Sequence, residues 1–167
     1  SSAKCARILN DRGISVHFCI DNDGTIYQLV DMNNAAWHAG DRQINHSSIG
    51  VEISDAYDLQ WQDWYVSKGF GERPVMEGVV CHGQLLQPFL GFYPIQLKAL
   101  AALYAAINKI FNIPLKAPTV SNTVDPLVKS NAFRGFCSHY HITTRKIDCA
   151  GLDIEAVCNE AITLNQD

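Results

Sequence analysis

The stretch FCSHYHITTRKIDCAG, residues 136–151, concentrates side chains that can bind a metal ion or stabilise negative charge. His139 and Asp148 are nine residues apart, and Lys146 precedes the aspartate by two residues. A catalytic zinc ion takes about three protein ligands from His, Asp, Glu or Cys and leaves one position open for water. A nearby cation stabilises the oxyanion that forms when such a water attacks a carbonyl. The stretch therefore indicates either a zinc-dependent hydrolase or a polar loop without a metal ion.

The composition limits what else the protein can be. The chain has 167 residues, of which 47% are hydrophobic and 18% are charged, as is typical of a single globular domain. The formal net charge of -4 provides no basic surface for nucleic acid, and no Lys/Arg cluster suggests an anionic membrane surface. No apolar run approaches the roughly 20 residues that span a bilayer. We expect a monomer, no nucleic-acid partner and no membrane insertion.

Six cysteines are spread along the chain without a CxxC pair, which argues against a four-cysteine structural zinc site. We expect mostly buried thiols, with one disulfide as an open alternative. A cysteine hydrolase would need a thiol that a histidine activates. Cys81 with His82 and Cys137 with His139 are the candidate pairs, but no helix N-terminus is predicted to activate either thiol. The sequence therefore argues against this class of enzyme.

Strands and helices must bring residues 136–151 close to other parts of the chain. Four segments are predicted to be strands: 14–20, 25–30, 47–54 and 135–139. The DNDG sequence between the first two is a strong hairpin signal. Three segments have the apolar spacing of helices: 2–13, with Cys5, Ile8 and Leu9 on one face, 94–111 and 152–164. This mixture predicts an α/β domain with a single mixed β-sheet flanked by helices.

Four motifs occur in order along the chain: ISVHFCIDNDGTIYQLVD, AAWHAG, NHSSIGVEIS and HYHITTRKID. Together they resemble the zinc-dependent N-acetylmuramoyl-L-alanine amidases, whose fold phage amidase-type lysozymes and animal peptidoglycan-recognition proteins share. The resemblance covers residues 3–164 and implies one amidase-like domain over 1–167, with variable insertions at about 55–93 and 112–133. It implies that a zinc-activated water hydrolyses the amide between N-acetylmuramic acid and L-alanine, and that the partner is peptidoglycan or a muropeptide.

The resemblance also assigns roles to individual residues. His139 and Asp148 match two of the zinc ligands of the family. Glu52 in SIGVE matches the acidic residue that holds and deprotonates the zinc water, and Lys146 matches the lysine that stabilises the oxyanion. Three further positions are expected to line the cleft or contact substrate: Trp37, His38 and Arg145. An ion-pair role for Arg145 stays open, as do core and sugar-stacking roles for Trp61, Trp64 and Tyr65.

The chain departs from the family pattern at the first zinc histidine, which in the family lies on a strand ahead of the first helix. We expect either that an N-terminal segment carries this ligand or that the metal site is incomplete. His17 matches a different family position, and His38 and Cys149 are the other candidates for a third ligand. An incomplete site would favour a second function, a non-catalytic muropeptide-binding module. The presence of both Glu52 and Lys146 favours the enzyme.

The substrate class bears on localisation. Polymeric peptidoglycan lies outside the cytoplasm, so the resemblance favours a periplasmic or secreted protein. A cytoplasmic location is compatible with a recycling enzyme that acts on soluble fragments, or with a phage lysis protein before its release.

Overall fold

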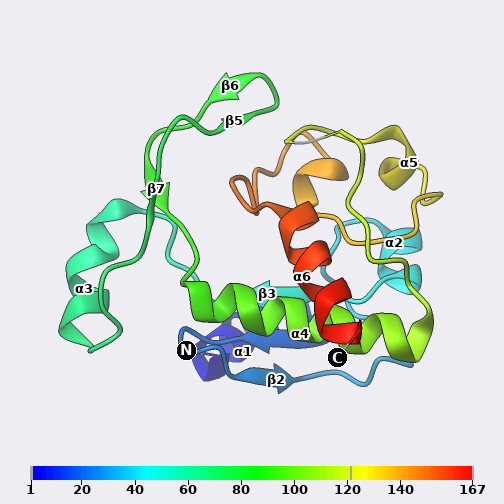
Figure 1. Ribbon diagram of the computed structural model, residues 1–167, viewed down its shortest axis with the longest axis horizontal. Coiled ribbons are helices and arrows are strands. Elements are labelled where there is room, and N and C mark those ends of the chain that lie inside the picture. The colour runs from blue at the N-terminus through cyan, green and yellow to red at the C-terminus, as the bar shows by residue number, and fades with distance from the viewer. Residues whose placement is uncertain (1, 121, 167) are drawn as a thin grey trace.

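The computed structural model describes residues 2–120 and 122–166. Its central sheet has three strands in the order β2-β1-β3, formed by Phe18–Ile20 (β1), Ile26–Gln28 (β2) and Val51–Ile53 (β3). β1 pairs antiparallel with β2, across the predicted hairpin turn, and parallel with β3, so the sheet is mixed. The predicted α/β class, a mixed sheet with flanking helices, is confirmed (Figure 1).

Two long helices cover one face of this sheet. α4 (Pro94–Phe111) and α6 (Ile154–Gln166) pack against each other and occupy two of the predicted helical segments. The buried core combines side chains of both helices with those of β1 and β3: Phe18, Ile20, Ile53, Leu100, Leu103, Ile107, Val157 and Ala161. Burial of each large aliphatic side chain contributes roughly 1.5–3 kcal/mol. Within the part of the chain that the structure describes, no helix combines the length and apolarity of a membrane span.

The opposite face of β1 carries α1 (Ser2–Asp11), the predicted N-terminal helix. Because side chains alternate along a strand, Cys19 points away from the α4–α6 core and packs with Leu9. Ile8, predicted on one apolar face with Cys5 and Leu9, lies at the edge of this face and is 45% exposed. Positions 5 and 9 are one helical turn apart and form a narrow stripe, which leaves position 8 beside it.

Two predicted strands differ from the structure. The segment 47–54 pairs only at β3, because Ser47 ends the short helix α2 (Arg42–Ser47), which Asp41 caps at its start. The segment 135–139 is not a strand, and the 3-10 helix η2 (His139–His141) begins at its end. Instead of a strand ladder, the N–H of Phe136 donates to the Lys116 carbonyl at 2.9 Å and the N–H of Ser138 donates to Nδ1 of His141 at 3.0 Å. A further short helix, α5 (Pro126–Lys129), lies between α4 and this segment.

Residues 55–93, which we predict to be a variable insertion, form an arm that projects from the rest of the molecule (Figure 1). The arm contains η1 (Leu59–Trp61), α3 (Gln62–Ser67), β4 (Val75–Met76), β5 (Val80–Cys81), β6 (Gln84–Leu85) and β7 (Phe89–Leu90). β4 pairs with β7 and β5 pairs with β6, both antiparallel, so β5 and β6 lie at the tip. Strands of two residues are too short for an alternating pattern, and the sequence therefore does not predict them.

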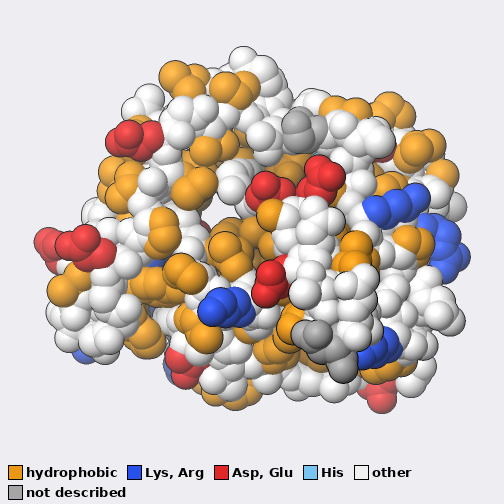
Figure 2. All heavy atoms as spheres, viewed as in Figure 1, with side chains coloured by type: hydrophobic (Ala, Val, Ile, Leu, Met, Phe, Trp, Pro, Cys, Tyr) orange, Lys and Arg blue, Asp and Glu red, His pale blue; other side chains and the backbone are white. Residues whose placement is uncertain are grey.

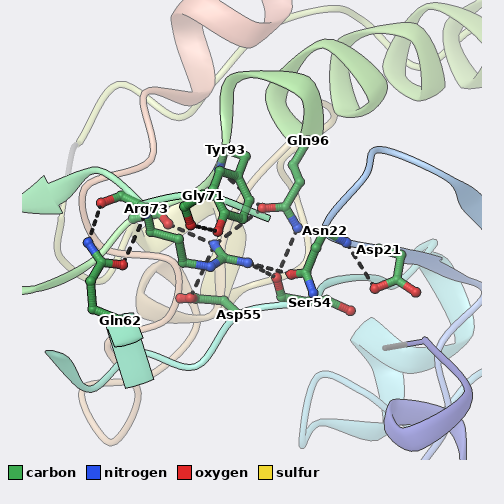
Figure 3. Close-up of polar contacts among 10 residues, drawn as sticks. Asp21, Asn22, Ser54, Asp55, Gln62, Gly71, Arg73, Tyr93 and Gln96 are labelled. Carbon is green, nitrogen blue, oxygen red and sulfur yellow. Dashed lines mark hydrogen bonds and ion pairs between the residues drawn. The ribbon is translucent and has the colours of Figure 1, made fainter. Parts of the chain in front are cut away.

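A buried arginine anchors the base of the arm (Figure 3). Arg73 is only 2% exposed, and its guanidinium donates hydrogen bonds to Asn22 Oδ1 (2.6 Å), Ser54 O (2.8 Å), Gly91 O (2.8 Å) and Gln96 Oε1 (3.3 Å). Its Cζ atom lies 4.3 Å and 4.4 Å from the ring centres of Tyr65 and Tyr93. Asp55 forms an ion pair with it at 3.4 Å. The network joins the arm to the β1–β2 turn, the end of β3 and the start of α4.

Candidate active site

The predicted catalytic and ligand residues converge on β3, an edge strand of the central sheet. Glu52 is the middle residue of β3, His139 opens η2, and Lys146 and Asp148 follow on the next loop. A cavity of about 1130 Å³ is lined by these four residues together with two of the predicted cleft residues, Trp37 and His38. Arg145, the third predicted substrate contact, is exposed on the same loop and does not line this cavity.

Hydrogen bonds from Ser138 hold the two ends of the loop together. The Ser138 hydroxyl donates to the carbonyl oxygen of Asp148 at 2.6 Å and accepts the N–H of Cys149. The N–H of Tyr140 also donates to the Asp148 carbonyl, at 3.3 Å. These bonds bring His139 and Asp148 together although nine residues separate them in the sequence. Neither periodicity nor residue type in the sequence indicates this role for Ser138.

His139 and Asp148 form a direct ion pair. Nδ1 of His139 lies 2.7 Å from Oδ2 of Asp148, and Nε2 lies 2.9 Å from the carbonyl oxygen of His38. A carboxylate and a carbonyl are both hydrogen-bond acceptors, so both ring nitrogens donate and the ring is protonated in this arrangement. The electrostatics agree, because the hydrogen bond with Asp148 raises the pKa of His139 and lowers the pKa of Asp148.

Glu52 is half-buried beside these charged groups. Burial raises the pKa of Glu52, while the positive charges of His139 and Lys146 lower it. A carboxyl group with a raised pKa transfers protons near neutral pH more readily than an exposed one, which suits a general base or acid. The site therefore combines a candidate proton-transfer group, a lysine and a histidine–aspartate pair.

A catalytic zinc ion requires a third donor beside His139 and Asp148. Within the described residues, no group of three or more His, Cys, Asp and Glu side chains is arranged to hold a metal ion. The ring of His17 is engaged elsewhere. Its Nδ1 accepts the Gly50 N–H at 2.9 Å, and its Nε2 lies 2.9 Å from the carbonyl oxygen of Asn34. His17 therefore joins the β1 region to the segment before β3 and is a structural residue.

The other two candidates for a third ligand are also unsuited to the role. The His38 ring nitrogens lie 3.0 Å from the Ala36 carbonyl oxygen and 3.1 Å from Ser48 Oγ, so both are engaged in hydrogen bonds. The N–H of Cys149 is held by the Ser138 hydroxyl, and among the described residues Cys149 belongs to no group of three or more His, Cys, Asp and Glu side chains that could hold a metal ion. The residues in this arrangement supply two donors and do not fit a complete zinc site with three protein ligands.

The aromatic residues near the cavity have different surroundings. Trp37, Trp61 and Trp64 line the cavity with side chains that are 48%, 45% and 40% exposed. Tyr65 is only 3% exposed and packs on Arg73. The sequence leaves core and wall roles open for these residues, and the structure assigns the core role to Tyr65 and the wall role to the tryptophans.

Residues 1–151 match the sequence model of the N-acetylmuramoyl-L-alanine amidase family. The chain belongs to this amidase family. A solved complex of the N-acetylmuramyl-L-alanine amidase AmiD from E. coli with anhydro-N-acetylmuramic acid-L-Ala-D-gamma-Glu-L-Lys is similar to it, with 23% identity and a TM-score of 0.44. That similarity covers 69% of the amidase-family chain and 42% of the solved chain, so the chain spans less than half of its length. No curated protein matches the chain.

The tip of the arm contacts the site loop of this amidase-family chain. Nε2 of His82 lies 2.9 Å from the carbonyl oxygen of Lys146, and the His82 N–H donates to the Asn122 carbonyl at 2.8 Å. Residues of the arm and the loop share a small apolar cluster whose buried members are Cys81, Tyr140 and Ala150. The arm is therefore held at its base by Arg73 and at its tip by the site loop.

The structure also shows the surroundings of the two cysteine–histidine pairs considered from the sequence, Cys81 with His82 and Cys137 with His139. Cys81 is 1% exposed and burial raises the pKa of its thiol, while His82 faces the site loop. The ring of His139 contacts Asp148 and His38 through its two nitrogens, which leaves neither nitrogen to activate a thiol. Among the described residues, neither of these two pairs is therefore arranged as the nucleophile and base of a cysteine hydrolase.

A second cavity, of about 740 Å³, borders the same residues. Glu52, His139 and Asp148 line both cavities. The second cavity lies between the arm and the helices α4 and α6, and its wall is largely apolar, with side chains that include Tyr57, Met76, Phe89, Leu97 and Val157. Figure 2 shows the hollow between the arm and α6, bordered by hydrophobic side chains. The site of the amidase-family chain therefore borders two cavities.

Proposed function

We propose that this chain hydrolyses the amide bond between N-acetylmuramic acid and L-alanine in peptidoglycan or muropeptides. The observation that carries the proposal is the convergence of Glu52, His139, Lys146 and Asp148 on one cavity. Membership of the amidase family supports the reaction class. The solved relative is a complex with a muropeptide, which supports the same substrate class for this chain. Because polymeric peptidoglycan is extracytoplasmic, we also propose a periplasmic or secreted site of action.

In the proposed reaction, the residues of the chain act on a water molecule and on the amide carbonyl. Glu52 accepts a proton from the attacking water and returns it to the leaving amine of L-alanine. The Lys146 ammonium stabilises the negative charge on the tetrahedral intermediate. The exposed indoles of Trp61 and Trp64 provide flat apolar surfaces along the cavity against which the substrate packs.

Zinc dependence is a separate part of the proposal. A bound zinc ion would polarise the carbonyl and lower the pKa of water toward ~7. His139 and Asp148 are the two donors proposed for it, and in this arrangement Nδ1 of His139 and Oδ2 of Asp148 are occupied by their mutual ion pair. The described residues do not form a zinc site with three protein ligands in this arrangement, and the proposed proton transfers therefore involve Glu52 and the proposed charge stabilisation involves Lys146.

The proposal is tested with a muramoyl peptide as substrate and release of the L-alanine amino group as readout. We expect Glu52→Gln and Lys146→Ala each to lower the rate about 10²–10³-fold, as is typical of general bases and oxyanion donors. Glu155→Gln and Lys109→Ala remove the same functional groups at exposed positions outside both cavities and are the matched controls. Unchanged rates in both site variants would exclude this assignment of the site.

A second candidate function is a muropeptide-binding module without hydrolysis. The observation that favours it is the presence of only two metal donors, His139 and Asp148, in the described arrangement. Elemental analysis of the purified chain with added zinc, together with calorimetric binding of a muramoyl peptide, separates the two functions. One zinc per chain with cleavage supports the amidase, whereas tight peptide binding with neither zinc nor cleavage supports the module.

A further inference from the structure

Two cysteine sulfurs lie in contact on the face of β1 that carries α1. Sγ of Cys5 and Sγ of Cys19 are 3.6 Å apart, although 14 positions separate the residues in sequence. The sulfurs of a disulfide are about 2.05 Å apart, so they need to approach by only about 1.5 Å.

The secondary structure fixes this juxtaposition. Phe18 and Ile20 point into the α4–α6 core, so the alternation of the strand directs Cys19 to the opposite face. On α1, Cys5 and Leu9 are one turn apart and share the face that packs on β1. Cys19 is fully buried and Cys5 is half-buried, so one sulfur is enclosed while the other is reached from solvent.

The two thiols also differ in reactivity. The Cys19 thiol donates a hydrogen bond to Cys5, and this bond lowers the pKa of Cys5. The same bond, together with burial, raises the pKa of Cys19. The accessible thiol is therefore the one that ionises more easily, and a thiolate is the species that attacks a disulfide.

We propose that Cys5 and Cys19 form a disulfide site that closes by exchange with a small-molecule disulfide such as oxidised glutathione. The Cys5 thiolate attacks one glutathione sulfur, the S–S bond of the oxidant breaks, and one glutathione leaves as a thiolate. The Cys19 sulfur then loses its proton to solvent and attacks Sγ of Cys5, which releases the second glutathione. The two cysteines together lose two electrons, and the oxidant gains them as two thiols.

The disulfide would tie α1 to the strand beside the site. Leu9 is the only buried residue among residues 3–11, so the noncovalent packing of α1 against β1 is limited. Cys19 is the register partner of Glu52 in the parallel β1–β3 pair. Residues of α1, including Cys5 and Leu9, line the same cavity as Glu52. The covalent link therefore fixes one wall of the cavity, and its formation does not depend on the proposed hydrolysis.

The test treats the purified chain with oxidised glutathione and counts free thiols after denaturation. We expect two of the six thiols to be lost and trypsin to release residues 5–7 linked to residues 13–42, since Lys4, Arg7, Arg12 and Arg42 bound these peptides. The melting temperature of the oxidised chain should rise by roughly 6–12 °C, because closing a loop of about 15 residues restricts the unfolded chain. Reduction with dithiothreitol should reverse the rise.

Two variants separate this disulfide from general oxidation. Cys5→Ser removes the attacking thiol at a half-buried position and should abolish both the linked peptide and the rise in melting temperature. Cys137→Ser removes an exposed thiol and should leave both unchanged. A lasting mixed disulfide on Cys5, or an equal rise in melting temperature in Cys5→Ser, would overturn the proposal.

Discussion

The ring of His82 and the main-chain carbonyl of Lys146 are joined by a hydrogen bond of 2.9 Å between residues 64 positions apart. Through this bond the tip of the arm supports the loop that carries Lys146 and Asp148. The Nδ1 atom of His82 is buried and has no hydrogen-bond partner among the described residues. The ring is therefore tied to the loop through Nε2, which carries the proton when it donates to the carbonyl.

Removal of this support should loosen the loop without unfolding the protein. His82→Ala deletes one hydrogen bond, worth about 1 kcal/mol. We expect amide hydrogen exchange in residues 142–149 to become about 3–10-fold faster in this variant, with little change in α4. Glu77→Ala, an exposed substitution on the same arm, is the control. Equal exchange in the wild type and His82→Ala would show that the contact does not restrain the loop.

Arg73 should be among the residues whose loss is most destabilising. Arg73→Met removes the cation and leaves the Asp55 carboxyl, whose side chain is 16% exposed, without its ion-pair partner. This change costs at most about 3–5 kcal/mol, the range typical of a fully buried pair. Urea denaturation measures the loss of unfolding free energy. The double variant with Asp55→Asn should recover part of it, because the buried carboxylate is then absent. Exposed Arg7→Ala is the control, and a comparable loss there would argue against the network.

Asp55 should also make stability depend on pH. Burial raises the pKa of Asp55 to about 6, above its ordinary value of 3.8, although Arg73 lowers it. The folded state therefore binds the proton more tightly than the unfolded state. The contribution of the Asp55 carboxyl to the free energy of unfolding is fully present below pH 3.8 and is lost as pH rises through about 6. The change is at most about 3 kcal/mol.

Unfolding free energies at several pH values between 4 and 7.5 test this dependence. The histidines also titrate in this range, so the relevant quantity is the difference between the wild type and Asp55→Asn at each pH. We expect this difference to shift in favour of the variant as pH rises. A difference that is constant across the range would show that the Asp55 carboxyl titrates alike in the folded and unfolded chains.

Glu52→Gln should separate stability from activity. Burial of the Glu52 carboxyl disfavours its charged form, and a neutral amide of the same shape avoids this cost. We expect an unchanged or slightly higher melting temperature together with the loss of hydrolysis proposed above. A large fall in melting temperature would instead identify Glu52 as a structural residue of β3.

The sequence predicts the elements whose patterns are local. The apolar spacing of 94–111 coincides with α4, because Pro94 opens the helix and Asn112 ends it in a left-handed conformation. The hairpin between β1 and β2 follows from its four-residue turn. The resemblance to the amidases selects seven residues, of which all but Arg145 line one cavity.

Other features depend on contacts between distant segments. Arg73 stands between a glutamate and a proline in an exposed-looking stretch, and its partners Asn22 and Gln96 are 51 and 23 residues away. Ser138 holds the site loop only because the fold brings the carbonyl of Asp148 within hydrogen-bond distance of its hydroxyl. A hydrogen bond between distant segments produces no periodic pattern in the sequence around either residue. The sequence therefore does not indicate the roles of Arg73 and Ser138.

The network around Arg73 has a consequence for how the molecule comes apart. The guanidinium belongs to the arm, while three of its acceptors lie outside it, on Asn22 in the β1–β2 turn, Ser54 after β3 and Gln96 in α4. Detaching the arm would leave the guanidinium without these three acceptors and would remove a charged donor from the polar groups left behind. The arm is therefore not a detachable appendage. The arm should unfold together with the sheet in a single cooperative transition. A chain engineered without residues 56–92 would lack Arg73 and would leave Asn22, Ser54 and Gln96 without this hydrogen-bond donor.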